Sequence, residues 1–290
     1  MLDFIINPIA GGKKGKKMSK NLAIIKEYLT QRQVEYNLHF STKRGDVKTL
    51  TKTLIDKGAT DIVIVGGDGS LHEAINGFHS FDKANLGIIP CGTGNDFASA
   101  LGIPQNPIKA LDLIIDGTPK YTDYMQMPTV RGLNIIGMGI DVDVLKRYNA
   151  LKRKTKFGYT MSLVKTLFKF DYVQFDATFN QQTTGYKSFI ACIANGHRYG
   201  GGIPICPVAD PTDNQLDFVA VKSMRKLKII GAFLKLKAGK LLSLKEAVHH
   251  KTKFVKILSP VPYTVNVDGE LYDNIPFEVE IVPNTLKVYR

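Results

Sequence analysis

Two glycine-rich segments follow two apolar runs that have the composition of buried parallel strands. Gly66-Gly67-Asp68-Gly69-Ser70 comes directly after the run 61–65, and Gly92-Thr93-Gly94-Asn95-Asp96 comes directly after the run 86–90. Glycine lets backbone N–H groups approach phosphate oxygens, and a helix after each loop would turn its positive N-terminus toward the same point. One such loop could be only a tight turn. Two loops on neighbouring strands predict a site for nucleotide phosphates.

Two better-known nucleotide motifs do not fit the sequence. The segment Gly11 to Lys16 resembles a Walker A loop, but it has three residues between its glycines where that motif has four. In addition, neither Ser nor Thr follows Lys16. Neither glycine loop has the GxGxxG spacing with an acidic residue at the required distance. A P-loop NTPase and a dinucleotide-dependent dehydrogenase are therefore disfavoured.

The elements around these loops alternate between strand and helix signals. Apolar runs predict strands at 2–6, 34–40, 61–65 and 86–90, and sequence patterns predict helices at 19–33, at 46–57 and from 71 onward. Such a series forms an open, mostly parallel sheet with helices on both faces, and ligands bind at the carboxyl ends of its strands. We therefore expect an α/β nucleotide-binding domain over residues 1–125.

Strand signals dominate the rest of the chain. They lie at 133–138, 172–179, 187–194, 216–221, 254–258, 263–267 and 276–282. Many short strands without regular helices between them predict an antiparallel β-sandwich or barrel. We expect this all-β domain to span 126–283, and the last residues, 284–290, could return to either domain.

Positive charge is concentrated in the second part of the chain. The 290 residues are 44% hydrophobic and carry a formal net charge of +13, of which +11 lies after residue 124. The stretches 146–170 and 218–258 hold most of this excess. This hydrophobic content excludes a disordered chain. The basic stretches are compatible with a solvated face, a nucleic-acid site or a surface that meets an anionic membrane.

Other features limit the classes of protein that the sequence fits. Its longest apolar stretches fall far short of the ~20 residues that span a bilayer. The segment Met1 to Asn7 lacks a basic part before its apolar run, so we expect a first strand here rather than a signal peptide, and a cytoplasmic protein. Three scattered cysteines do not form a disulfide framework, and no CxxC or HExxH pattern predicts zinc. His249 and His250 are interpreted as solvated.

Several motifs in order resemble the diacylglycerol kinase catalytic family, which includes sphingosine and ceramide kinases and bacterial lipid kinases. The two loop motifs run from Gly66 to Gly77 and from Pro90 to Ala98. Further matches extend over nearly the whole chain, at Asn7-Pro8, Gly45-Asp46, Asp123, Asn134 and 266–270. The resemblance implies a phosphofructokinase-like parallel α/β domain followed by a β-sandwich domain, in agreement with the element pattern.

The resemblance also implies which residues contact ATP. They fall in the loops that follow the predicted strands: Asn7, Pro8, Ile9, Ala10, Gly11, Ser41, Gly66, Gly67, Asp68, Gly69, Ser70, Leu71, His72, Glu73, Thr93 and Asn95. Ser70 replaces the Thr that is common in the family and keeps its hydroxyl. His72 replaces a common Asn, and its imidazole could donate to phosphate or lie at the surface.

Carboxylates are implied for metal binding and proton transfer. Asp68, Asp96 and Asp123 match a set that holds Mg²⁺ through water near the phosphates, which suits an ion that gives up its waters reluctantly. Glu270 matches the general base that takes the proton from the lipid hydroxyl, and Asp68 is counted with it as catalytic.

A second Mg²⁺ loop is implied by the segment 210–215. It would use the Asp213 side chain and the backbone carbonyls of Asp210 and Gln215. The family usually has Gly where this chain has Asn214. Asn tolerates a left-handed backbone, so the loop can form, but the substitution leaves the metal in doubt.

We therefore expect an ATP- and Mg²⁺-dependent lipid kinase. The favoured acceptor is diacylglycerol, which gives phosphatidic acid; ceramide, long-chain bases and polyprenols are alternatives, and an NAD kinase-like enzyme is a weaker one. The expected partners are a lipid substrate in a membrane and an anionic membrane surface, with peripheral attachment from the cytoplasm. A homodimer is compatible with the resemblance. Nucleic acid is disfavoured, because only the charge supports it.

Overall fold

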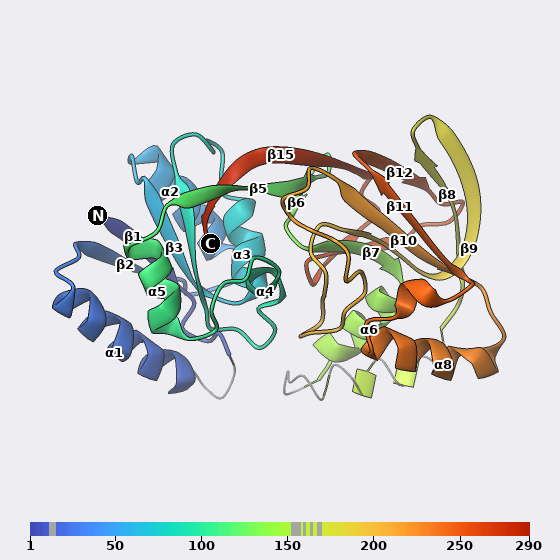
Figure 1. The fold of residues 1–290 in the computed structure, drawn as a ribbon, viewed down its shortest axis with the longest axis horizontal. Helices are drawn as coiled ribbons and strands as arrows, with labels where there is room; N and C mark the ends of the chain where they lie inside the picture. Colours follow the sequence, from blue (N-terminus) through green and yellow to red (C-terminus); the bar gives the residue numbers. More distant parts are fainter. Residues whose placement is uncertain (12–15, 152–157, 159–160, 163–164, 167–169) are drawn as a thin grey trace. The chain divides into compact units, whose positions relative to one another are not determined.

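The computed structural model describes the chain except for residues 12–15, 152–157, 159–160, 163–164 and 167–169 (Figure 1). The basic stretch 146–170 and the first glycine–lysine loop therefore lie partly outside the described residues. The chain divides into two compact units, Met1–Asp123 with Asn284–Arg290, and Tyr124–Pro283.

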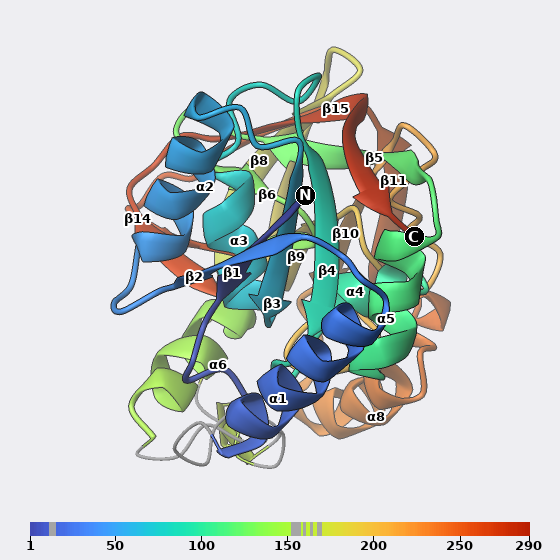
Figure 2. The ribbon, with the colours of Figure 1, turned by 90° about the vertical axis from the view of Figure 1, so that its left-hand side faces the viewer.

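The first unit is a parallel sheet with helices on both faces. Its elements in chain order are β1 (Leu2–Ile6), α1 (Lys16–Gln31), β2 (Tyr36–Phe40), α2 (Asp46–Asp56), β3 (Asp61–Gly66), α3 (Asp68–Ile75), β4 (Asn85–Pro90), α4 (Asp96–Ala100) and α5 (Pro107–Ile115). Strand β5 (Pro119–Gln126) begins in this unit, and β15 (Phe277–Tyr289) ends in it. Helices α2 and α3 cover one face of the sheet, and α1 and α5 cover the other (Figure 2).

The strand order in this sheet brings the predicted loops to one edge. The order is β2-β1-β3-β4-β15, and all four pairs are parallel. Residues Ile62 to Val65 of β3 are fully buried, because helices cover the sheet on both sides. Since the strands are parallel, the loops after β1, β3 and β4 leave the sheet at the same edge.

The second unit is built mainly of antiparallel strands. Its elements are β6 (Arg131–Gly132), β7 (Ile135–Gly139), α6 (Ile140–Asn149), β8 (Val173–Phe179), β9 (Gln182–Ala194), β10 (Leu216–Lys222), α8 (Lys226–Lys237), a 3₁₀ turn (Leu241–Ser243), β11 (Ala247–Thr252), β12 (Phe254–Leu258), β13 (Thr264–Val267), β14 (Glu270–Asp273) and the first part of β15. The pairing follows the order β14-β13-β7-β9-β8-β12-β15, and β10 pairs with β9 and β11.

Side chains alternate between two cores in this unit. On β10, Phe218 and Ala220 point into a core made by strands, while Val219 and Val221 point into a second core that includes residues of α6 and α8. This period of two is the signature of strands that are covered on both faces. The predicted fold class, an α/β domain followed by a β-sandwich domain, is confirmed.

The structure adds elements that the sequence analysis missed. Strands β11 and β14 were not predicted, and the strand predicted at 276–282 continues to Tyr289 as one element, β15. The last residues of β15 pair with β4, with Val288 opposite Leu86. Among the described residues, no helix is long and apolar enough to cross a membrane.

Candidate functional site

The two glycine loops of the first unit touch through their backbones. The amides of Cys91 and Gly92 donate to the carbonyl oxygen of Gly66 at 2.7 and 3.1 Å. A Cβ on Gly67 would lie 2.8 Å from Cα of Gly92, and a Cβ on Gly92 would lie 2.5 Å from Cα of Gly67. Both glycines are therefore required by the contact between the loops, in addition to any role toward phosphate.

Asn95 holds the second loop in shape. Its backbone is left-handed, with φ of 57°. Its Oδ1 accepts from the amide of Gly92 at 2.8 Å, and its Nδ2 donates to Oε1 of Gln105 at 2.9 Å. Because these bonds occupy a side chain that is also buried, the structure gives Asn95 a positioning role. The sequence analysis missed Gln105, which carries no motif signal.

A third loop joins the first two at the end of β1. The side-chain Nδ2 of Asn7 donates to Oγ of Ser70 at 3.1 Å, and Oδ1 of Asn7 accepts from the backbone amide of Ile9 at 3.2 Å. Pro8 and Ile9 are exposed, and Gly11 adopts a φ of 78°. The structure thus brings together the loops after β1, β3 and β4.

Helix α3 starts at the glycine loop. The amides of Ser70 and Leu71 donate to the carbonyl of Gly67, at 2.9 and 3.1 Å. The helix begins at Asp68, and the start of a helix presents backbone amides that have no earlier carbonyl within the helix to donate to. Gly69 is exposed next to them, as is Thr93 in the second loop. Exposed backbone at a helix N-terminus suits the binding of phosphate.

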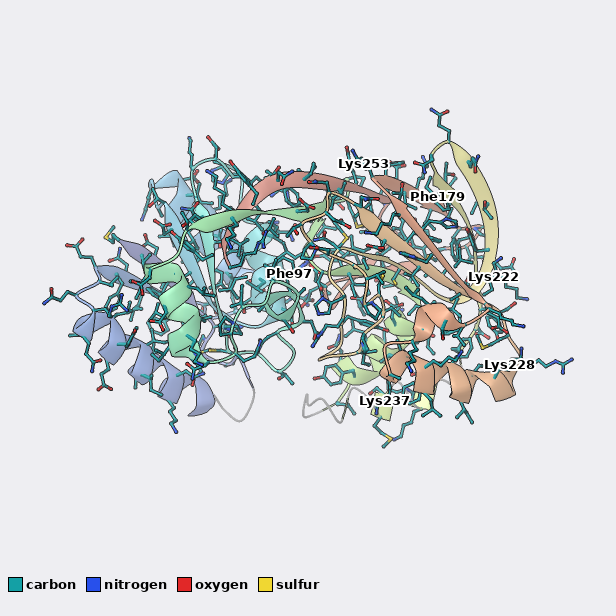
Figure 3. The ribbon with its side chains drawn as sticks, viewed as in Figure 1. Phe97, Phe179, Lys222, Lys228, Lys237 and Lys253 are labelled. Carbon is teal, nitrogen blue, oxygen red and sulfur yellow. The ribbon has the colours of Figure 1, made fainter. Side chains whose placement is uncertain are left out.

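Asp68 connects α3 to the second loop. Its Oδ1 accepts from the amide of Phe97, the second residue of α4, at 3.2 Å. The side chain of Phe97, labelled in Figure 3, is buried. Asp68 itself is partly exposed, so its carboxylate lies at the boundary between the core of the first unit and solvent.

Glu73 binds the start of another helix. Its two carboxylate oxygens accept from the amides of Gly45 and Val47, at 2.9 and 3.1 Å. These amides lie at the N-terminus of α2, where backbone donors lack partners within the helix. The Glu73 side chain is therefore engaged by the protein itself.

Two other predicted ATP contacts are buried. Ser41 lies at the end of β2, and its amide donates to the carbonyl of Ile6 at 2.9 Å. His72 is only 3% exposed, so it is not a surface histidine.

The three carboxylates predicted for Mg²⁺ differ in exposure. Asp96 is buried, and Asp123 is fully buried with its Oδ1 accepting from the amide of Asn284 at 2.9 Å. In the part of the chain that the structure describes, no group of three ligand atoms within 4.8 Å includes these residues. The partly exposed oxygens of Asp68 fit an ion that keeps most of its waters. Asp68 is thus the residue of this set that would hold Mg²⁺.

Glu270 lies at the start of β14, after a two-residue turn in the second unit. Asp268 and Gly269 have φ of 52° and 96°, the positive values of a tight hairpin turn, and Val267 pairs with Glu270 across it. Glu270 is partly exposed.

Asp268 and Asn266 hold this hairpin in place through side-chain hydrogen bonds. The Asp268 carboxylate accepts from the amides of Leu133, Asn134 and Ile135, at 2.6, 2.8 and 3.0 Å. Asn266 accepts from the amide of Gly269 at 2.8 Å and donates to Asp141 at 3.1 Å. Burial raises the pKa of Asp141 to about 7. The role of Asp268 as an acceptor for the amides of Leu133, Asn134 and Ile135 was not predicted from the sequence.

The loop at 210–215 has its carboxylates occupied. Oδ1 of Asp210 accepts from the amide and hydroxyl of Thr212, and Oδ1 of Asp213 accepts from the amide of Gln215 at 3.0 Å. The ammonium of Lys251 contacts Oδ2 of Asp213. Asn214 adopts a φ of 61°. Asp213 is the one side chain expected to bind the metal here, and Lys251 already contacts it. This loop therefore does not fit Mg²⁺.

Comparisons with known proteins agree with the arrangement of these motifs. Residues 2–127 match the model described as diacylglycerol kinase catalytic domain, and residues 134–290 match the YegS C-terminal NAD kinase beta sandwich-like domain. The chain is 28% identical over 275 residues to the "Probable lipid kinase YegS-like" of Xanthomonas oryzae pv. oryzae, which covers 90% of this chain and 88% of that protein. It is 28% identical over 257 residues to a "Diacylglycerol kinase" of Mycobacterium tuberculosis, with coverage of 84% and 81%.

A solved structure shares the fold. The crystal structure of a diacylglycerol kinase from Bacillus anthracis str. Sterne matches with a TM-score of 0.71 at 23% identity, over 99% of this chain and 96% of that chain.

Proposed function

Because the chain belongs to the family that joins a diacylglycerol kinase catalytic domain to a YegS C-terminal β-sandwich-like domain, we propose that it transfers the γ-phosphoryl group of ATP to a lipid hydroxyl. The proposed acceptor is diacylglycerol, and the product is phosphatidic acid. The observation that carries the proposal is the joined set of loops after β1, β3 and β4, with exposed backbone at the N-terminus of α3.

The glycine loops would position the phosphates of ATP. Phosphoryl transfer depends mainly on positioning and on stabilising charge at the transferred group. Exposed amides at Gly69 and around Thr93 would donate to phosphate oxygens, while Asn95 and Ser70 keep the loops in place. Mg²⁺, held at Asp68, would supply positive charge at the phosphates when bound.

Glu270 would act as the general base for the acceptor hydroxyl. A carboxylate can take this proton when it lies within hydrogen-bond reach of the hydroxyl. The hairpin supports the assignment, because Asp268 and Asn266 fix the turn while the Glu270 side chain stays partly exposed. Glu270→Gln keeps the shape of the side chain but removes its basicity.

The acceptor is tested with a panel of lipids. Purified protein is incubated with ATP labelled at the γ-phosphate and with vesicles that contain diacylglycerol, ceramide, a long-chain base or a polyprenol, and the products are separated by chromatography. Label in phosphatidic acid alone supports the proposal. Label in another lipid would change the acceptor. Label in NADP alone, from a parallel incubation with NAD, would reject a lipid kinase.

The Glu270→Gln variant tests the assigned base. We expect kcat to fall by roughly 10²-fold or more with little change in ATP affinity. Glu280→Gln, at an exposed position of β15, is the matched control and should keep its activity. A fall of only a few fold in the Glu270→Gln variant would remove Glu270 from this role.

Helix α8 would attach the protein to an anionic membrane. Its Ile229, Ala232 and Leu236 are buried in the second unit, whereas Ile230 and Leu234 are 51% and 61% exposed. Lys228 and Lys237 belong to this helix (Figure 3), and the ammonium of Lys228 contacts Oε1 of Glu246 at 3.0 Å. Exposed apolar residues next to lysines suit a helix that lies in the membrane interface. Leu163, Leu167 and Phe168, which belong to the basic stretch 146–170, lie outside the described residues.

Charge reversal on α8 tests this surface. Because each cation contributes about 1 kcal/mol near an anionic leaflet, changing Arg225, Lys228 and Lys237 to Glu should lower vesicle binding by at least about 100-fold. Changing the exposed Lys48 and Lys52 of α2 and Lys57 just after it to Glu makes the same change in net charge and is the control. Equal losses in both variants would mean that net charge, rather than α8, governs binding.

A further inference from the structure

The pairing of β10 with β11 places an acid and a histidine on one face of the sheet. Asp217 lies opposite Lys251, and Val219 lies opposite His249. Opposite residues share a face, and so do residues two apart along a strand. Asp217 and His249 are therefore diagonal neighbours. His249 is exposed, as interpreted from the sequence, but it also has a partner, because its Nε2 lies 2.5 Å from Oδ1 of Asp217.

A cysteine from the loop between β9 and β10 completes the cluster. The ligand atoms of Cys206, Asp217 and His249 all lie within 4.8 Å of one another. Cys206 and Asp217 are fully buried, and the His249 side chain is 30% exposed. Oδ2 of Asp217 is buried and has no hydrogen-bond partner among the described residues. A fully buried carboxylate oxygen without a partner costs free energy unless a ligand satisfies it.

We propose that Cys206, Asp217 and His249 bind a zinc ion. Sulfur, oxygen and nitrogen donors at this separation suit the small tetrahedral shell of Zn²⁺, and water would fill the fourth position. The ion would displace the thiol proton of Cys206 to solvent and the proton that lies between His249 and Asp217. One thiolate and one carboxylate then balance the charge of the ion, so the buried site is neutral.

The surroundings favour this assignment over a reactive cysteine. Burial, followed by the charge of Asp217, raises the pKa of Cys206 to about 12, so without metal it is a protonated thiol and a poor nucleophile. Lys251 is the nearby cation, and its ammonium contacts Asp213. The partly exposed His249 provides a path for the ion from solvent. The metal would tie the Cys206 loop to the paired strands β10 and β11, a structural role separate from phosphoryl transfer.

Metal titration of the full-length protein tests the site. The protein is freed of metal with a chelator and titrated with Zn²⁺ in competition with a coloured chelator, and native mass spectrometry gives the stoichiometry. Co²⁺ replaces Zn²⁺ in a parallel titration, because a cobalt–thiolate bond absorbs in the near ultraviolet. We expect one tight site per chain, a thiolate absorption band, and a higher unfolding temperature with zinc.

Single variants identify the ligands. Cys206→Ser should remove the cobalt–thiolate band, and His249→Gln should lower zinc affinity by at least about 100-fold, since even changes outside the ligand shell cost 10- to 100-fold. His250→Gln is the matched control, because His250 lies on the opposite face and its ring packs against Phe179 in a tilted arrangement. It should bind zinc like the unmodified protein.

Other outcomes would overturn the proposal. They are the absence of tight zinc binding, cobalt binding without a thiolate band, and a band that survives in Cys206→Ser. The first two are measured on the unmodified protein, so they decide the question even if a variant does not fold. None of these readouts depends on kinase activity.

Discussion

Two polar loops of the molecule use their hydrogen-bonding groups in opposite ways. In the loop 66–70 of the first unit, glycines bring two backbones together, and exposed backbone remains at the start of α3. In the loop 210–215 of the second unit, both aspartates accept from the loop's own amides, and Lys251 contacts Asp213. The first loop leaves backbone exposed at the start of a helix, while both carboxylates of the second loop are bound by other groups of the protein.

The comparison extends to the other polar motifs. Asp268 accepts three amides of its own chain, and Glu73 accepts two. The function of a carboxylate within a motif can therefore be to hold the backbone in place. A carboxylate whose two oxygens both accept from backbone amides is not available to a ligand. The candidates for ligand binding are therefore the other carboxylates.

The largest effect is expected where a carboxylate serves the backbone. Asp268→Ala leaves three buried amides, those of Leu133, Asn134 and Ile135, without their acceptor. Each buried unsatisfied group costs about 1–3 kcal/mol, so we expect the free energy of unfolding to fall by more than about 2 kcal/mol. Urea denaturation followed by circular dichroism measures it.

Asp273→Ala is the control for this substitution. Asp273 is an exposed carboxylate of the same hairpin, and its Oδ1 accepts from the Thr264 hydroxyl at 2.5 Å. Its loss should change stability by about 0.5 kcal/mol or less. If both variants were equally stable, the three amides would not depend on Asp268.

A smaller effect is expected where two backbones touch. Gly92→Ala would place a methyl 2.5 Å from Cα of Gly67, and Gly67→Ala would place one 2.8 Å from Cα of Gly92. Overpacking of this kind costs about 1–3 kcal/mol. We therefore expect both variants to lose stability as well as ATP affinity, measured by thermal unfolding and calorimetric titration.

Gly231→Ala in α8 provides the contrast. An added Cβ there meets no atom within 4 Å, and alanine favours a helix by about 1 kcal/mol over glycine. It should be neutral or stabilising. If Gly67→Ala and Gly92→Ala lost ATP affinity with unchanged unfolding temperatures, the glycines would serve the phosphates alone.

Local patterns predicted the fold class and the positions of the two loops. The β-branched run 61–65 and the glycines after it are adjacent in sequence, so one window contains the whole signal. Contacts between distant residues were not predictable in this way. Asp268 binds amides more than 130 positions earlier, and Asp217 meets His249 only through the register of β10 and β11. Strand β11 was missed because its histidines and lysine hide the alternation.

The smallest effect on stability is expected at Lys251. This substitution tests whether the protein's own groups keep cations out of the loop 210–215. Lys251→Met removes the ammonium that contacts Asp213, a pair that is partly exposed, so stability should change by no more than about 1 kcal/mol. The carboxylate is then free to bind a cation. We expect millimolar Mg²⁺ to raise the unfolding temperature of the variant, but not that of the unmodified protein, with zinc and nucleotide absent.

Lys253→Met separates this effect from a general loss of positive charge. Lys253 (Figure 3) is exposed two residues further along the chain and removes the same charge, so its variant should not respond to Mg²⁺. An equal response in the unmodified protein and in Lys251→Met would mean that the ammonium of Lys251 does not exclude Mg²⁺ from the loop. No response in Lys251→Met would mean that the loop cannot bind Mg²⁺ even without the lysine. Asn214, with its φ of 61° where the family usually has Gly, would then be the position to change next.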